Sequence, residues 1–107
     1  MSVPEIPVAE LEALLADGVP LFDVRQPDEY AEARVPGAVL VPLGDVAESL
    51  DRFPTDRAVY VICRSGGRSM KAAELLRANG VDAVNVEGGT MAWVTSGLAY
   101  DTDAPTA

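Results

Sequence analysis

VYVICRSGGRS, residues 59–69, combines the pattern of a strand, a tight loop and the start of a helix. The first four residues are apolar on both alternating faces, which is typical of a central parallel strand covered on both sides. Two adjacent glycines follow, and the next apolar residues have helical spacing, which predicts a helix over 70–77 that ends before Gly80. This order of elements indicates an α/β fold.

Cys63 lies at the expected carboxyl end of this strand and faces the start of the helix. Open α/β sheets bind their ligands at such strand ends. Backbone N–H groups of the loop can form an anion-binding nest, and Arg64 and Arg68 add positive charge. These surroundings favour the thiolate, which is the nucleophilic form of cysteine. A buried structural cysteine is the alternative, and the coincidence of strand end, glycines and arginines favours a nucleophile.

Length and charge restrict the organisation of the chain and its partners. The 107 residues suffice for one compact core, so we expect a single domain over 1–107, with its core at about 5–97 and a flexible tail over 98–107. A net charge of −9 disfavours nucleic acid and anionic membranes as partners. There is no apolar run of membrane-spanning length and no signal-peptide pattern, so we expect a cytoplasmic location.

The chain has one cysteine and no histidine. An internal disulfide, a Ser-His-Asp triad and a Cys-His pair are therefore excluded. A zinc site would have to consist almost wholly of carboxylates, so the sequence predicts neither a metal nor another cofactor. Backbone dipoles, arginines or hydroxyl groups must activate Cys63.

Three segments of the chain resemble the rhodanese family of sulfurtransferases. The first is the active loop, a cysteine followed by a short run containing Arg and Gly, here Cys63 to Arg68. The second is DVRQPDEY at 23–30, and the third is GGTMAW at 88–93. A fourth, VPGA at 35–38, matches in part, because Arg34 replaces the histidine that is common in the family. The resemblance extends from about residue 5 to residue 97.

The resemblance implies an α/β three-layer sandwich, with a central, mostly parallel five-stranded sheet and helices on both faces. The local patterns agree with it. They predict strands over 5–7, 20–24, 39–41, 59–62 and 83–86. They predict helices over 8–17, 27–31, 44–50, 70–77 and 90–96.

The resemblance also implies the chemistry of a thiosulfate sulfurtransferase. Cys63 would accept a sulfane sulfur as a persulfide, and an acceptor such as cyanide or a thiol, thioredoxin included, would remove it. The residues expected to bind the anionic donor are Arg64, Ser65, Gly66, Gly67, Arg68 and Ser69. Asp23 and Arg25 are expected to pair at the end of their strand and so to support the neighbouring loops.

Three other functions remain open. A sulfur carrier that serves one partner protein would use the same cysteine. Cysteine-dependent phosphatases and arsenate reductases have a Cys-x5-Arg loop, whereas here Arg68 follows Cys63 after four residues, which makes a smaller cradle. A regulatory module of the same fold usually lacks the cysteine, which is present here.

Overall fold

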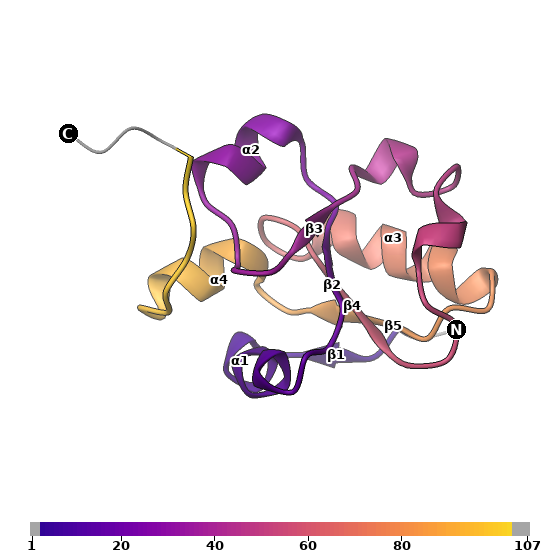
Figure 1. Ribbon diagram of the computed structural model, residues 1–107, viewed down its shortest axis with the longest axis horizontal. Coiled ribbons are helices and arrows are strands. Elements are labelled where there is room, and N and C mark those ends of the chain that lie inside the picture. Colours follow the sequence, from indigo (N-terminus) through magenta and orange to yellow (C-terminus); the bar gives the residue numbers. More distant parts are fainter. Residues whose placement is uncertain (1–2, 104–107) are drawn as a thin grey trace.

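The computed structural model describes residues 3–103, and within them five strands form one wholly parallel sheet (Figure 1). Across the sheet the order is β1, β5, β4, β2 and β3. The strands are Glu5–Ile6 for β1, Leu21–Asp23 for β2, Val39–Leu40 for β3, Val59–Ile62 for β4 and Ala83–Val86 for β5. The predicted five-stranded sheet is therefore confirmed, with β4 at its centre.

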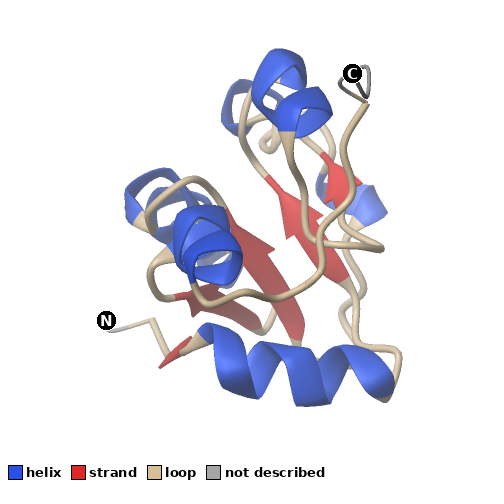
Figure 2. Ribbon diagram, turned by 90° about the vertical axis from the view of Figure 1, so that its left-hand side faces the viewer, coloured by secondary structure: helices blue, strands red, loops and turns tan. Residues whose placement is uncertain are grey.

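Helices flank the strands of this sheet (Figure 2). In the described part of the chain they are α1 at Val8–Ala16, α2 at Pro27–Glu32, α3 at Gly67–Ala78 and α4 at Gly89–Thr95. Successive side chains of β4 point to opposite faces and join two separate apolar clusters. Val61 shares one cluster with Leu76 of α3. Ile62 shares the other with Leu11 of α1 and Trp93 of α4. The predicted three-layer arrangement is confirmed, and none of the helices within residues 3–103 is long and apolar enough to cross a membrane.

The strand β3 differs from the sequence-based prediction of a buried strand over 39–41. It is an edge strand that pairs only with β2 within the described residues. Val39 is consequently 41% exposed, although Val41, just beyond the strand, is buried. The apolar run predicted the strand correctly, but the place of a strand in the sheet depends on contacts far along the chain.

Two short 3₁₀ turns, Leu43–Asp45 and Leu50–Arg52, occupy the segment where the sequence predicts a helix over 44–50. Their backbone hydrogen bonds span three residues instead of four. Gly44 lowers the helix propensity, and so short a segment gains too few hydrogen bonds to nucleate an α-helix. The prediction of an α-helix here is therefore wrong.

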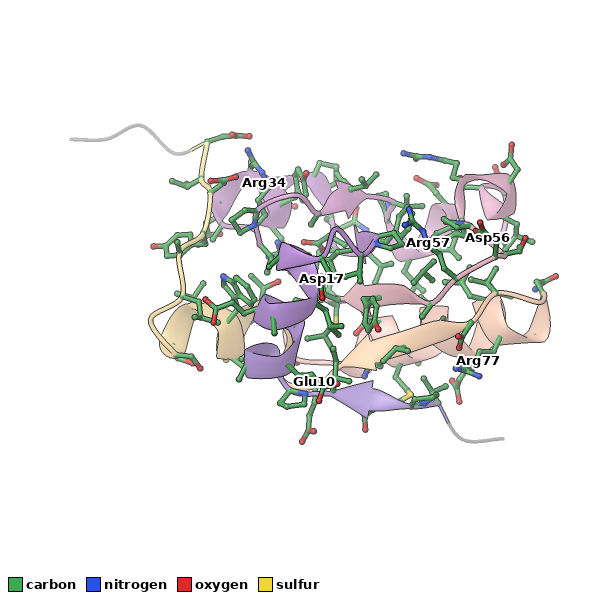
Figure 3. The ribbon with its side chains drawn as sticks, turned by 60° about the horizontal axis from the view of Figure 1, so that its bottom comes forward. Glu10, Asp17, Arg34, Asp56, Arg57 and Arg77 are labelled. Carbon is green, nitrogen blue, oxygen red and sulfur yellow. The ribbon has the colours of Figure 1, made fainter. Side chains whose placement is uncertain are left out.

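The C-terminal segment was predicted to be a flexible tail over 98–107, but its first part is ordered against the segment that follows α2. The backbones of Arg34 and Asp101 form an antiparallel bridge, with both N–H to oxygen contacts at 2.9 Å. The guanidinium of Arg34 also lies 2.9 Å from the carboxylate of Asp103, and Figure 3 shows Arg34 beside this segment. The paired backbone groups correct the prediction up to residue 103, and the rest of the predicted tail, 104–107, lies outside the described residues.

Candidate active site

Cys63 directly follows β4, and its sulfur lies within the loop that leads into α3. The residue is only 1% exposed. The N–H of Gly66 donates to the Sγ atom at 3.1 Å, and the hydroxyl of Ser69 lies 3.2 Å from the same atom. Gly66 has a φ of +112°, which L side chains rarely adopt, so the turn that aims its N–H at the sulfur requires glycine. The predicted strand, loop and helix around Cys63 are confirmed.

Opposing effects act on the pKa of the Cys63 thiol. Burial raises this pKa, because the thiolate loses solvation. The hydroxyl of Ser69 and the backbone N–H groups of Ser69, Gly66 and Ser65 lower it by donating hydrogen bonds to the sulfur. The lowering effects prevail, so the pKa of Cys63 lies below its ordinary value. Neutral hydrogen-bond donors thus favour the nucleophilic thiolate.

Asn85 of β5 extends this hydrogen-bond network behind the loop. Its Oδ1 atom lies 2.5 Å from the hydroxyl of Ser69. Its Nδ2 group donates to the carboxylate of Glu5 at 2.8 Å and to the carbonyl oxygen of Gly66 at 3.2 Å. Asn85 is 1% exposed. Asn85 and Glu5 are not among the site residues predicted from the sequence, although a polar residue inside the apolar run of β5 is a visible signal.

The guanidinium of Arg68 does not lie free beside the loop. It donates to both carboxylate oxygens of Glu29 on α2, at 2.7 and 2.8 Å. The Arg68 contact lowers the pKa of Glu29 to about 2. The ion pair therefore ties α2 to the first turn of α3. Glu29 is not among the site residues predicted from the sequence, although it lies inside the DVRQPDEY motif.

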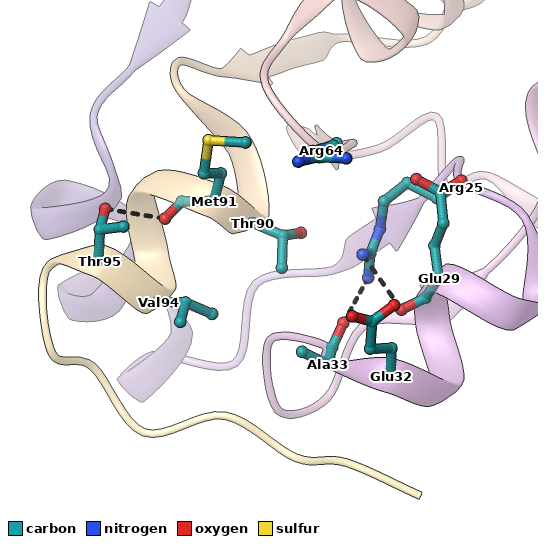
Figure 4. Close-up of a pocket in the computed structure, with 9 residues that line it drawn as sticks. All are labelled: Arg25, Glu29, Glu32, Ala33, Arg64, Thr90, Met91, Val94 and Thr95. Atoms are coloured by element: carbon teal, nitrogen blue, oxygen red, sulfur yellow. Dashed lines mark hydrogen bonds between the residues drawn. The ribbon is translucent and has the colours of Figure 1, made fainter. Parts of the chain in front are cut away.

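The predicted ion pair of Asp23 and Arg25 is present at the end of β2, and both residues are buried. The guanidinium of Arg25 donates to Asp23 from Nε at 2.9 Å and from its terminal nitrogen at 2.7 Å. It also donates to the backbone oxygens of Glu29 at 3.3 Å and Ala33 at 2.7 Å, as Figure 4 shows. Arg25 thus holds α2 and the segment after it at the carboxyl edge of the sheet.

A pocket of about 240 Å³ opens between α2 and α4, next to the active loop (Figure 4). Arg64 lies on its rim, exposed, and its guanidinium has no ion pair or hydrogen bond within residues 3–103. Thr90 lines the pocket with a buried hydroxyl that also lacks a partner in the described part of the chain. Met91 and Val94 add apolar wall. Among the described residues that line the pocket, Arg64 is therefore the one cationic side chain without a partner that could attract an anion.

Gly89 brings the start of α4 against the active loop. A Cβ atom at this position would lie 2.5 Å from the carbonyl oxygen of Cys63 and 2.6 Å from the backbone of Arg64. The next residue, Thr90, donates its backbone N–H to that carbonyl oxygen at 2.8 Å. Glycine at the second position of the GGTMAW motif therefore permits this close contact with the loop that carries Cys63.

The structure thus brings most of the predicted site residues to one edge of the sheet. Three of them donate hydrogen bonds to the sulfur, Ser65, Gly66 and Ser69, and Gly67 begins α3. The two arginines differ: Arg68 pairs with Glu29, whereas Arg64 lines the pocket. Within residues 3–103, no group of three or more His, Cys, Asp or Glu side chains is arranged to hold a metal ion.

Comparison with known proteins places this arrangement in a family. Residues 7–96 match the family described as "Rhodanese-like domain". The chain belongs to this family. It is 43% identical over 95 residues to the "Putative sulfurtransferase YtwF" of Bacillus subtilis, a match that covers 87% of this chain and 92% of the relative. It is 38% identical over 99 residues to a protein named "Sulfurtransferase" of Allochromatium vinosum, with 90% and 92% covered.

A solved structure gives the same result for the fold. The crystal structure of a rhodanese-like domain protein from Staphylococcus aureus matches with a TM-score of 0.81 at 40% sequence identity. The match covers 85% of this chain and 91% of that protein. The family resemblance inferred from the sequence motifs is therefore confirmed, and the rhodanese-like domain supports sulfur transfer as the general class of activity.

Proposed function

We propose that this rhodanese-like domain is a sulfurtransferase that takes a sulfane sulfur from thiosulfate onto Cys63. The observation that carries the proposal is the buried Sγ atom, which faces the N–H of Gly66 and the hydroxyl of Ser69. These donors lower the pKa of the thiol and supply the nucleophile without a general base. The backbone N–H of Gly66 also remains in place to stabilise the negative charge of a persulfide.

In the first step the Cys63 thiolate attacks the outer sulfur of thiosulfate. A bond forms between Sγ and that sulfur, the bond to the central sulfur breaks, and its electron pair leaves with sulfite. Arg64 is the side chain proposed to attract the dianionic donor, since its guanidinium is exposed and unpaired in the described part of the chain. Donor binding by the other loop residues, 65–67 and 69, is part of the proposal.

Arg68 has an indirect role in this proposal. Its charge is largely neutralised by Glu29, so it acts by holding α2 beside the loop and not as a free anion-binding group. The buried pair of Asp23 and Arg25 likewise supports the position of α2, from the end of β2.

In the second step a small thiophilic acceptor, cyanide or a thiol, removes the sulfur from the persulfide. Because Cys63 is only 1% exposed, a small acceptor or a narrow protein segment such as that around the thiol of thioredoxin fits better than a broad protein surface. A carrier that serves one dedicated partner would share the first step and differ in this second one. We place the activity in a single cytoplasmic domain with its core at about 5–97.

The test is to incubate the protein with thiosulfate and measure its intact mass. One sulfur atom should be added, cyanide should remove it, and Cys63→Ser should take up none. Steady-state assays with thiosulfate, 3-mercaptopyruvate and a generic phosphate ester, side by side, compare the donors and the phosphatase alternative. Sulfur transfer retained in Cys63→Ser, or turnover of the phosphate ester alone, would overturn the proposal.

A further inference from the structure

The hydroxyl of Ser69 has more acceptors within reach than it has protons. It lies 2.5 Å from Oδ1 of Asn85, 3.2 Å from Sγ of Cys63 and 3.3 Å from the carbonyl oxygen of Gly66. A serine hydroxyl carries one proton and can make one strong donation at a time. Asn85 and Cys63 therefore compete for the same proton, and the shorter contact is the one to Asn85.

The orientation of the Asn85 amide is determined by its other neighbours. On one side it faces the carboxylate of Glu5 at 2.8 Å and the carbonyl oxygen of Gly66 at 3.2 Å, and both groups only accept hydrogen bonds. The Nδ2 group must therefore point to that side. Oδ1 then faces Ser69 as an acceptor, and a turn of the amide would set its oxygen against two other oxygens.

We propose that Asn85, held in this orientation by Glu5, is a positioning residue that competes with the sulfur of Cys63 for the hydroxyl proton of Ser69. When Cys63 is a thiol, Ser69 donates to Asn85 and can accept from the S–H group. When Cys63 becomes a thiolate, Ser69 turns to the sulfur, and the buried Oδ1 of Asn85 loses its donor. This loss is a cost of forming the thiolate.

The same geometry has a consequence for the loaded state, and this step rests on the proposed function. In a persulfide the negative charge lies on the outer sulfur, so Sγ needs the hydroxyl of Ser69 less. Asn85 then receives the proton again, so its buried Oδ1 atom keeps a donor. The Asn85 acceptor thus disfavours the free thiolate relative to both the thiol and the persulfide.

Alkylation of Cys63 by iodoacetamide tests the competition without any sulfur transfer, because the chain has no other thiol. Asn85→Leu keeps a similar volume and removes the competing acceptor. Losing a competing hydrogen bond should speed alkylation about threefold to tenfold at about pH 6. The midpoint of the pH–rate profile should move to lower pH while the plateau rate at high pH, which reports access to the sulfur, stays the same.

Glu5→Gln is a second variant, which keeps the core intact because Glu5 is exposed. A glutamine at position 5 can donate a hydrogen bond to Oδ1 of Asn85, so the orientation of the Asn85 amide is less restricted. Alkylation should therefore be faster than in the wild type, but by a smaller factor than in Asn85→Leu. Glu87→Gln is the matched control. Glu87 is an exposed acid that follows β5 and has no side-chain partner within residues 3–103, so its loss should change nothing.

The decisive comparison is made in a Ser69→Ala background. Without the hydroxyl there is no proton to compete for, so Asn85→Leu and Glu5→Gln should no longer change the pH–rate profile. An unchanged or slower reaction in folded Asn85→Leu, or equal acceleration with and without Ser69, would overturn the inference. If Asn85→Leu does not fold, an unchanged pH–rate profile in Glu5→Gln would also overturn the inference. Sulfur uptake from thiosulfate is measured separately, so its absence counts against the proposed function and not against this competition.

Discussion

The two sides of the active loop are held by different interactions. On the β5 side, Ser69 and Asn85 form a buried network of neutral hydrogen bonds behind the sulfur of Cys63. On the α2 side, the ion pairs Asp23–Arg25 and Glu29–Arg68 hold the neighbouring helix. The neutral side acts on the reactivity of the sulfur, whereas the charged side acts mainly on the position of α2.

The charged side is itself divided by burial. The side chains of Arg25 and Asp23 are 5% and 0% exposed, whereas those of Arg68 and Glu29 are 36% and 26% exposed. A buried charge strongly destabilises the fold when its partner is removed, whereas water and salt compensate a partly exposed charge. The buried pair should therefore govern stability, and the outer pair should have a small effect that varies with pH.

The largest expected effect is the loss of stability in Arg25→Ala. Asp23 would remain buried without its partner, and the oxygens of Glu29 and Ala33 would lose donors. We expect the free energy of unfolding to fall by about 3–5 kcal/mol, measured by urea denaturation. Arg64→Ala removes an exposed arginine that has no side-chain partner in the described part of the chain, and it is the control without an effect on stability. Equal midpoints for both variants would contradict the division by burial.

Ser69→Ala should reduce reactivity more than stability. It removes the strongest of the hydrogen bonds that lower the pKa of Cys63, while burial continues to raise that pKa. Charge-assisted hydrogen bonds contribute about 1.5–3 kcal/mol, so alkylation and sulfur uptake at neutral pH should slow about tenfold or more. Ser65→Ala is the matched control, because Ser65 contributes through its backbone N–H. A similar loss in both variants would mean that the hydroxyl of Ser69 has no special role.

Glu29→Gln should change stability by less than about 1 kcal/mol near neutral pH, because the pair is partly exposed. The pKa of Glu29 is about 2 in the folded protein, below its ordinary value of 4.5. The pair's contribution is therefore complete above pH 4.5 and is lost as the pH falls towards 2. Urea denaturation across this range should show the difference between wild type and variant shrinking with acid. If the stability difference between wild type and Glu29→Gln grew on acidification, the pKa of Glu29 could not be lowered by its ion pair as stated.

Asp103→Asn should have the smallest effect. The carboxylate of Asp103 pairs with Arg34 at the surface, while its backbone N–H donates to Ala31 at 2.7 Å and is unaffected by the change. We expect the urea midpoint to stay within experimental error at physiological salt. A clear loss of stability would show that this exposed pair, and not the backbone bridge, orders the C-terminal segment.

Local patterns in the sequence were sufficient to predict the elements around the candidate nucleophile, Cys63. The alternation of β4, the glycines of the loop and the stripe of α3 are short-range features, so Cys63 and its setting could be predicted. Asp23 and Arg25 are two residues apart at the end of a strand, so one local segment contains both partners and their pair could be predicted.

The remaining contacts needed the folded chain. Glu29 meets Arg68 across 39 residues, and Asn85 meets Glu5 across 80, so no local pattern contains both partners. The edge position of β3 and the order of the segment up to residue 103 likewise depend on distant elements. The sequence by itself determined which residue is the candidate nucleophile and which fold presents it. Only the tertiary structure decided which side chains surround the Ser69 hydroxyl and which arginine of the active loop has no partner within residues 3–103, because both depend on groups brought together by the parallel sheet.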